Sequence, residues 1–130
     1  MPLGDPGGGN FEYTTEGLPK EVAFVEVPVK DMKRAIRFYC GILKFGLVSS
    51  SDDTSVLKLG PGCKIALVRR PNDVGKDTGI YLTVESPYEF NRRMVDEGVL
   101  MIRHPQKGPL GVFASFKDDD GNTLHVIGRS

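Results

Sequence analysis

Hydrophobic and polar residues follow the same order in two successive blocks of the chain. Residues 22–29 are rich in Val and Phe and predict a β-strand. The residues after it place apolar side chains at helical spacing, which gives one buried helix face: Met32, Ala35, Ile36, Tyr39 and Leu43. Residues 78–98 repeat the strand and the helix, with Ser86 standing 55 positions after Asp31.

Residues with strong positional preferences mark the ends of both predicted helices. Asp31 is the expected N-cap of the first helix, and Gly46 its expected stop. The second helix begins with the capping box Ser86-Pro87-Tyr88-Glu89, in which proline takes the first helical position, and ends at Gly98.

Short apolar runs separated by turn residues predict further strands after each helix. Those after the first helix are 45–50, 54–59 and 63–69, and residues 70–77 form a linker. After the second helix we expect a strand at 99–103, and then GVFASFK and TLHVIG as a hairpin around an Asp-Gly-Asn turn. The predicted fold is therefore α+β, with two βαβββ modules (22–70 and 78–129) that form a curved eight-stranded sheet.

Composition limits the classes of function that the chain can have. Its 130 residues suit one domain, 21–130, preceded by a Gly- and Pro-rich flexible arm at 1–20. Seventeen basic and seventeen acidic residues give no net charge, so we expect neither a nucleic acid nor a membrane as partner. The start of the chain has no apolar signal-peptide core, and Cys40 and Cys63 lack a CxxC partner. We therefore expect two free thiols in a cytoplasmic protein.

The order of these motifs resembles the vicinal oxygen chelate superfamily of glyoxalase I, bleomycin-resistance proteins and extradiol dioxygenases. Three features carry the resemblance: the run VPVKDMKRAIRFYCGILKF, the closing hairpin FKDDDGNTLHVIG, and the internal repeat. It covers about residues 22–128, and the chain is most similar to the small glyoxalase-related members, many of them of unassigned function.

The resemblance also indicates where a catalytic metal would be held. Enzymes of the family bind a divalent metal through His or Glu on four strands, and the equivalent positions here are Phe24, Ala66, Gly79 and His125. Three of these four side chains have no donor atom for a metal, whereas a catalytic site needs about three protein ligands. We therefore predict no metal cofactor, with a rebuilt site from Glu26 and His125 as the remaining alternative.

Strand alternation places His125 and Glu26 on the concave face of the predicted sheet. His125 shares its face with Thr123 and Ile127, while Leu124 and Val126 face the core. The histidine would serve as a wall of the cavity, as a general acid or base, or as a metal ligand. Glu26 needs a basic partner or a raised pKa if it is buried, and it would otherwise be solvated at the mouth of the cavity.

Further residues are expected to line the same cavity, and each of them would serve as a wall or as a ligand contact. The predicted ligand-binding residues are Phe24, Lys64, Tyr81, Thr83, Phe113 and Ser115. Together they describe a pocket that is part aromatic and part polar, which is typical of small-molecule sites. A second histidine, His104, is expected in a loop that could cover the cavity.

These patterns favour a glyoxalase-related protein that binds a small organic ligand, with at most metal-independent catalysis by His125 and Glu26. One alternative is a metal-dependent glyoxalase-like lyase or dioxygenase. The other is a structural or regulatory dimer without a ligand. We expect a homodimer in each case, because the edges of open sheets need to be covered.

Overall fold

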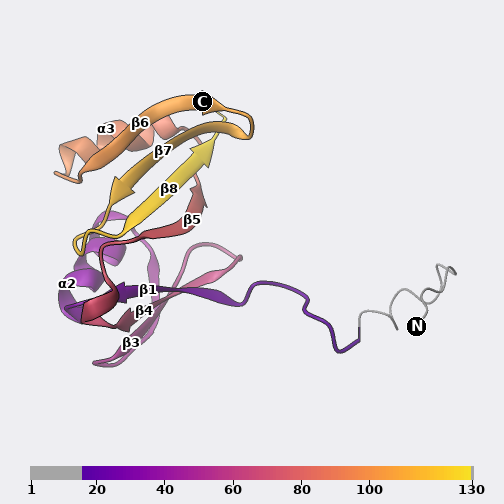
Figure 1. Ribbon diagram of the computed structural model, residues 1–130, viewed down its shortest axis with the longest axis vertical. Coiled ribbons are helices and arrows are strands. Elements are labelled where there is room, and N and C mark those ends of the chain that lie inside the picture. Colours follow the sequence, from indigo (N-terminus) through magenta and orange to yellow (C-terminus); the bar gives the residue numbers. More distant parts are fainter. Residues whose placement is uncertain (1–15, 130) are drawn as a thin grey trace, which may run out of the picture.

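A computed structural model describes residues 16–129, which form two modules of the same strand and helix order (Figure 1). Module one contains β1 (Phe24–Val29), α2 (Met32–Ile36), η2 (Arg37–Ile42), β2 (Gly46–Ser50), β3 (Thr54–Lys58) and β4 (Lys64–Arg69). After the short 3-10 helix η3 (Pro71–Asp73), module two contains β5 (Asp77–Thr83), α3 (Pro87–Asp96), β6 (Met101–Gly108), β7 (Gly111–Lys117) and β8 (Thr123–Gly128). Residues 1–15 of the expected arm lie outside the described part of the chain.

The strands hydrogen-bond as two four-stranded sheets of equivalent topology, with orders β1-β4-β3-β2 and β5-β8-β7-β6. In each sheet the first strand pairs in parallel with the last strand, which the helical crossover makes possible. This arrangement confirms the α+β fold of two βαβββ modules. Strands β1 and β5 are both edge strands, so each leaves one side of its backbone unpaired.

The helix of module one begins as predicted but changes its winding. The Asp31 side chain accepts a hydrogen bond from the backbone N–H of Arg34, which confirms the N-cap. From Arg37 the helix continues with π geometry rather than α geometry, and it ends at Ile42. The predicted stop at Gly46 was wrong, because the chain reverses at Lys44, whose φ is 66°, and Gly46 already belongs to β2.

The helix of module two follows the predicted signals more closely. Ser86 caps the N-terminus by accepting from the N–H of Glu89, and Pro87 occupies the first turn. The carboxylate of Glu89 pairs with Arg92 on the next turn. Gly98 follows the helix with a φ of 81°, the left-handed conformation that glycine adopts without strain.

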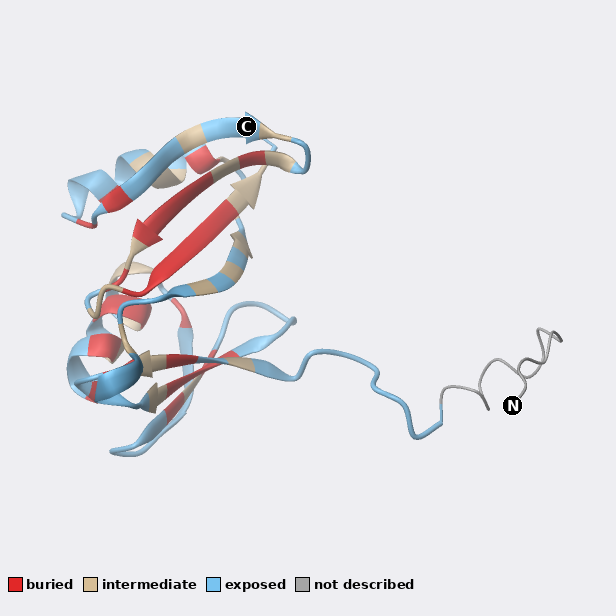
Figure 2. Ribbon diagram, in the orientation of Figure 1, coloured by how far each residue is buried: buried red, intermediate tan, exposed pale blue. Residues whose placement is uncertain are grey.

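Both modules contribute to one hydrophobic core, which lies between the sheets and the helices. Figure 2 shows the buried positions concentrated in the central strands, most of all in β7 and β8. Fully buried Val27 and Leu67 of module one belong to the same apolar cluster as Leu124 and Val126 of module two. The modules therefore share a core although their strands do not pair.

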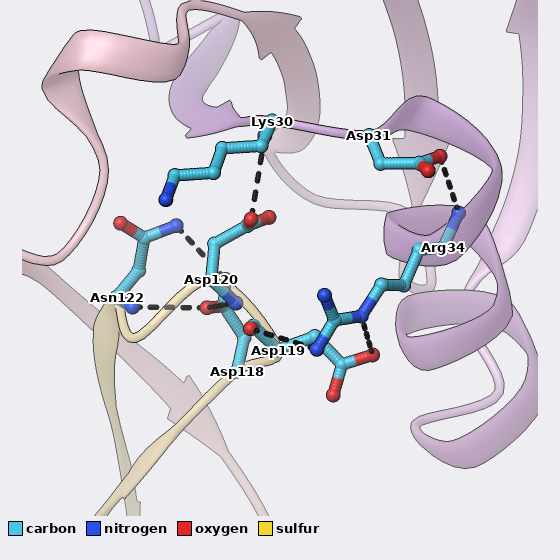
Figure 3. A network of polar contacts seen from close by, with 7 residues as sticks. All are labelled: Lys30, Asp31, Arg34, Asp118, Asp119, Asp120 and Asn122. Carbon is cyan, nitrogen blue, oxygen red and sulfur yellow. Dashed lines mark hydrogen bonds and ion pairs between the residues drawn. The ribbon is translucent and has the colours of Figure 1, made fainter.

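The turn between β7 and β8 connects the two modules through polar contacts (Figure 3). Buried Asp118 accepts from the hydroxyl of Tyr39 at 2.6 Å, and Asn122 donates to the carbonyl of Pro28 at 2.8 Å. Arg34 forms an ion pair with Asp119 at 3.4 Å. Within residues 16–129, the side-chain hydrogen bonds and ion pairs between the modules all end on this turn. We call residues 118–122 the intermodule turn.

Candidate functional site

An irregularity in β5 brings an unpredicted carboxylate into the candidate site. Asp77 is in register with Thr123 and Tyr81 with His125, so β5 contains two more residues than β8 over this stretch. The extra length is taken up at Gly79, whose φ is 70° and whose N–H donates to the Asp77 carboxylate at 2.9 Å. Asp77 was expected in the linker, but it is the first residue of β5.

His125 is held between two polar side chains on the face of the second sheet. Its Nδ1 lies 2.7 Å from the hydroxyl of Ser115, and its Nε2 lies 2.8 Å from Oδ1 of Asp77. An ionised carboxylate can only accept, so in the neutral imidazole Nε2 carries the proton and Nδ1 accepts from Ser115. Both ring nitrogens are therefore occupied, and a proton transfer to a ligand requires one of these bonds to open.

The charge on Asp77 is stabilised by the same contacts. The N–H of Gly79 and the imidazole of His125 both lower the pKa of the Asp77 carboxyl below its ordinary value of 3.8. Arg103 on β6 adds a smaller favourable interaction. Asp77 is thus ionised throughout the physiological range and keeps the tautomer of His125 fixed.

Tyr81 covers the imidazole and forms the boundary between this cluster and an open cavity. Its ring stacks on His125, with centroids 4.5 Å apart and an interplanar angle of 15°. Tyr81 is 56% exposed and lines the neighbouring cavity, so it is accessible to a ligand there. His125 itself is 7% exposed and Ser115 only 2%, which places both behind the cavity wall.

A cavity of about 580 Å³ lies between the edge strands β1 and β5. We call it the intermodule cavity. Its apolar walls come from both modules: Val22, Val25, Leu59, Ile65, Ile80 and Leu82. Its polar lining includes Glu26, Tyr81, Thr83 and the exposed thiol of Cys63. The predicted site residues Glu26, Tyr81 and Thr83 are therefore brought together at one surface.

A second cavity of about 320 Å³ lies on the face of the first sheet, and we call it the module-one cavity. Phe24, Glu26 and Lys64 line it, together with Arg70. The Glu26 carboxylate forms an ion pair with Arg70 at 3.0 Å and remains 43% exposed. Glu26 lines both cavities and has the basic partner that was one of its predicted alternatives.

The predicted pair of His125 and Glu26 does not form a direct contact. The partners of His125 are Ser115 and Asp77, and the partner of Glu26 is Arg70. The guanidinium of Arg103 lies over the ring of Phe113, with its Cζ atom 5.5 Å from the centroid of that ring. His104 was wrongly expected in a loop, because it lies on β6 and its Nδ1 is 2.9 Å from Oδ1 of Asn91 on the helix α3.

The residues at the family's metal positions do not fit a metal site. Phe24 and Ala66 provide no donor, Gly79 forms the irregular turn of β5, and His125 has both nitrogens in hydrogen bonds. Within the described part of the chain, no group of three or more His, Cys, Asp or Glu side chains is placed to bind a metal ion. Asp77 adds one donor atom near His125, but these two residues are fewer than the three protein ligands that a catalytic metal site typically has.

The sequence establishes the family. The sequence model of the Glyoxalase/Bleomycin resistance protein/Dioxygenase superfamily matches residues 21–126, and the chain belongs to this superfamily. Among curated proteins, the uncharacterized protein YetH of Bacillus subtilis (strain 168) is 26% identical over 114 residues, covering 81% of this chain and 95% of that protein.

Solved structures with a similar fold support the observed architecture. TnmS3, an antibiotic binding protein from Streptomyces sp. CB03234, has a TM-score of 0.76 at 24% identity, covering 86% of this chain and 98% of that one. A superfamily member from Sphaerobacter thermophilus DSM 20745 has a TM-score of 0.74 at 23% identity, covering 85% and 98%. At these identities the likeness concerns the fold. Within residues 16–129, no helix is long and apolar enough to cross a bilayer.

Proposed function

We propose that this protein binds a small organic molecule in the intermodule cavity. The observation that carries the proposal is the cavity itself, about 580 Å³ in volume and lined by apolar side chains with a few polar groups. This volume and lining are typical of sites for drug-sized ligands. The exposed face of Tyr81 offers a planar surface for stacking, which an aromatic ligand would use best.

The proposal concerns binding first, and any chemistry would pass through His125. Ser115, His125 and Asp77 form a continuous hydrogen-bonded chain from a buried hydroxyl to an exposed carboxylate. This arrangement would let His125 act as a general acid or base without a metal once one of its hydrogen bonds opens. It lies behind Tyr81, so displacement of that ring is a condition for catalysis.

A screen of small aromatic and aliphatic compounds by thermal shift tests the binding proposal. Tyr81→Ala should abolish the shifts caused by aromatic compounds, because it removes the stacking surface. Tyr88→Ala is the matched control, since Tyr88 lies on α3 outside the cavity and is 49% exposed, close to the 56% of Tyr81. If no compound shifts the melting point, or if Tyr81→Ala leaves every shift unchanged, the proposed site is wrong.

The two free thiols provide an independent readout for any compound that binds. Cys63 is exposed and lines the cavity, whereas Cys40 is half-buried and burial raises the pKa of its thiol. A ligand in the cavity should slow the alkylation of Cys63 by iodoacetamide and leave Cys40 unaffected. Equal protection of both thiols would indicate a general stabilisation of the protein instead of occupancy of the cavity.

Free thiols also fit a reducing compartment, so we extend the proposal to a cytoplasmic location.

We further propose that the protein forms a homodimer. The edge strand β2 is exposed along its whole length and carries Leu47 and Val48, which are 49% and 51% exposed. Edge strands with apolar side chains are commonly covered by a second copy of the chain.

A further inference from the structure

The charged residues around Glu26 are distributed unequally between the two cavities. The intermodule cavity is lined by one charged side chain, Glu26, and by no Lys or Arg of the described residues. The module-one cavity is lined by Lys64 and Arg70 in addition to Glu26. Glu26 therefore lies at the boundary between an acidic, mostly apolar space and a space with two cations.

Glu26 keeps part of its binding capacity free. Its Oε1 is paired with Arg70 at 3.0 Å, and among residues 16–129 Oε2 has no recorded hydrogen bond or ion pair. A carboxylate has about four acceptor sites on its two oxygens, so a second donor can be accommodated.

Lys64 provides the complementary charge on the same face of the sheet. It is in register with Phe24 on β1, while Glu26 is in register with Ala66 on β4. Strand spacings then put the backbones of Lys64 and Glu26 about 8 Å apart on one face, within reach of two long side chains. Lys64 is exposed and forms no ion pair within the described residues.

We propose that the ligand of this site is amphoteric, with an ammonium and a carboxylate on an apolar body. The ammonium binds Oε2 of Glu26, the carboxylate binds the ammonium of Lys64, and the apolar body occupies the intermodule cavity against Tyr81. This inference rests on the proposed binding function and adds the chemical class of the ligand. Two opposite charges set side by side on one sheet face select against molecules that carry only one of them.

Three probes that share a naphthalene ring test the inference: 2-naphthylalanine, 2-(2-naphthyl)ethylamine and 3-(2-naphthyl)propionate. The chain has no tryptophan, so naphthyl emission can be titrated directly. We expect 2-naphthylalanine to bind at least about fivefold more tightly than either singly charged probe. This ratio corresponds to the loss of one partly exposed ion pair whose free energy lies near the upper end of the measured range.

Charge-neutralising variants should separate the two contacts. Glu26→Gln should weaken naphthylalanine and naphthylethylamine by about fivefold and leave naphthylpropionate unchanged or tighter. Lys64→Gln should weaken naphthylalanine and naphthylpropionate and leave the amine unchanged or tighter. Controls with the same charge changes are Glu89→Gln and Lys33→Gln, on exposed helix positions outside both cavities.

Arg70→Gln adds a test in the opposite direction. Because Arg70 neutralises part of the charge on Glu26, its removal should tighten the binding of naphthylethylamine. Equal affinities of the three probes, or Glu26→Gln and Lys64→Gln effects no larger than those of their controls, would overturn the amphoteric class while the cavity proposal stands. If none of the probes binds, the amphoteric class and the aromatic site at Tyr81 both fail.

Discussion

Removal of the Tyr39 hydroxyl should destabilise the protein by an amount that the structure defines. Tyr39 is 1% exposed and donates to Oδ2 of Asp118 at 2.6 Å. In Tyr39→Phe the carboxylate keeps a bond from the Asn122 amide at 3.0 Å and two backbone N–H donors at 2.9 Å. Since the carboxylate remains largely satisfied, we expect the ordinary loss for a hydrogen bond to a charged group, about 1.5–3 kcal/mol.

The pH dependence of this loss has a definite sign. Burial, and then the charge of Asp118, raise the pKa of Tyr39 well above the ordinary tyrosine value of 10.0. The folded protein therefore keeps the Tyr39 hydroxyl protonated at pH values where the unfolded chain loses this proton. Because the unfolded tyrosine ionises at about pH 10, the free energy of unfolding of the wild type decreases above that pH. Tyr39→Phe has no such proton, and the difference in unfolding free energy between the two proteins should narrow above that pH.

Urea unfolding followed by circular dichroism at pH 7, 9 and 10.5 measures both effects. The slope of the unfolding free energy against urea should stay constant, so that the change in midpoint reports stability. Tyr88→Phe is the matched control, because that ring is 49% exposed on α3. A loss below about 0.5 kcal/mol at pH 7, or a difference that does not narrow at pH 10.5, would refute the role given to this hydrogen bond.

Three further predictions concern the site and the assembly. Asp77→Asn should be less stable than the wild type at pH 7, because folding favours the ionised form of this carboxyl. The difference in unfolding free energy should narrow as the pH falls through the carboxyl pKa, which lies below 3.8, and urea titrations at pH 7 and pH 3 check this. Elemental analysis of the purified protein should find no stoichiometric divalent metal, and metal that is lost in His125→Ala would overturn that expectation. Sedimentation equilibrium should give twice the chain mass of 14.2 kDa, and Leu47→Glu should shift the protein toward the monomer mass.

The regular parts of the chain could be predicted because their local signals agree with the final packing. Asp31, Ser86 and Gly98 act at the helix ends as expected, and Leu124 and Val126 are fully buried as strand alternation predicted. Tyr81 and Thr83 line the intermodule cavity, but Ile80 and Leu82 from the other face of β5 line it as well, so alternation alone does not account for this lining.

The parts that were missed depend on contacts between distant segments. Asp77 reaches His125 because β5 holds extra residues at Gly79, and alternation counted back from Tyr81 cannot account for an inserted turn. The available signal was Gly79 within an otherwise alternating strand, two residues before Tyr81, because a glycine inside a strand often marks a bulge. The π geometry of η2 is likewise absent from the local signals, since its sequence has the periodicity of an ordinary helix.

The intermodule turn has a consequence for ligand selection. The walls of the intermodule cavity belong to two sheets that share no backbone hydrogen bond, so the angle between the sheets sets the width of the cavity. Asp118 and Asn122 hold that angle from a position that lines neither ligand cavity. Substitutions in the turn can therefore change the width of the cavity without altering a lining residue, and relatives with identical lining residues are expected to differ in the size of the molecule that they accept.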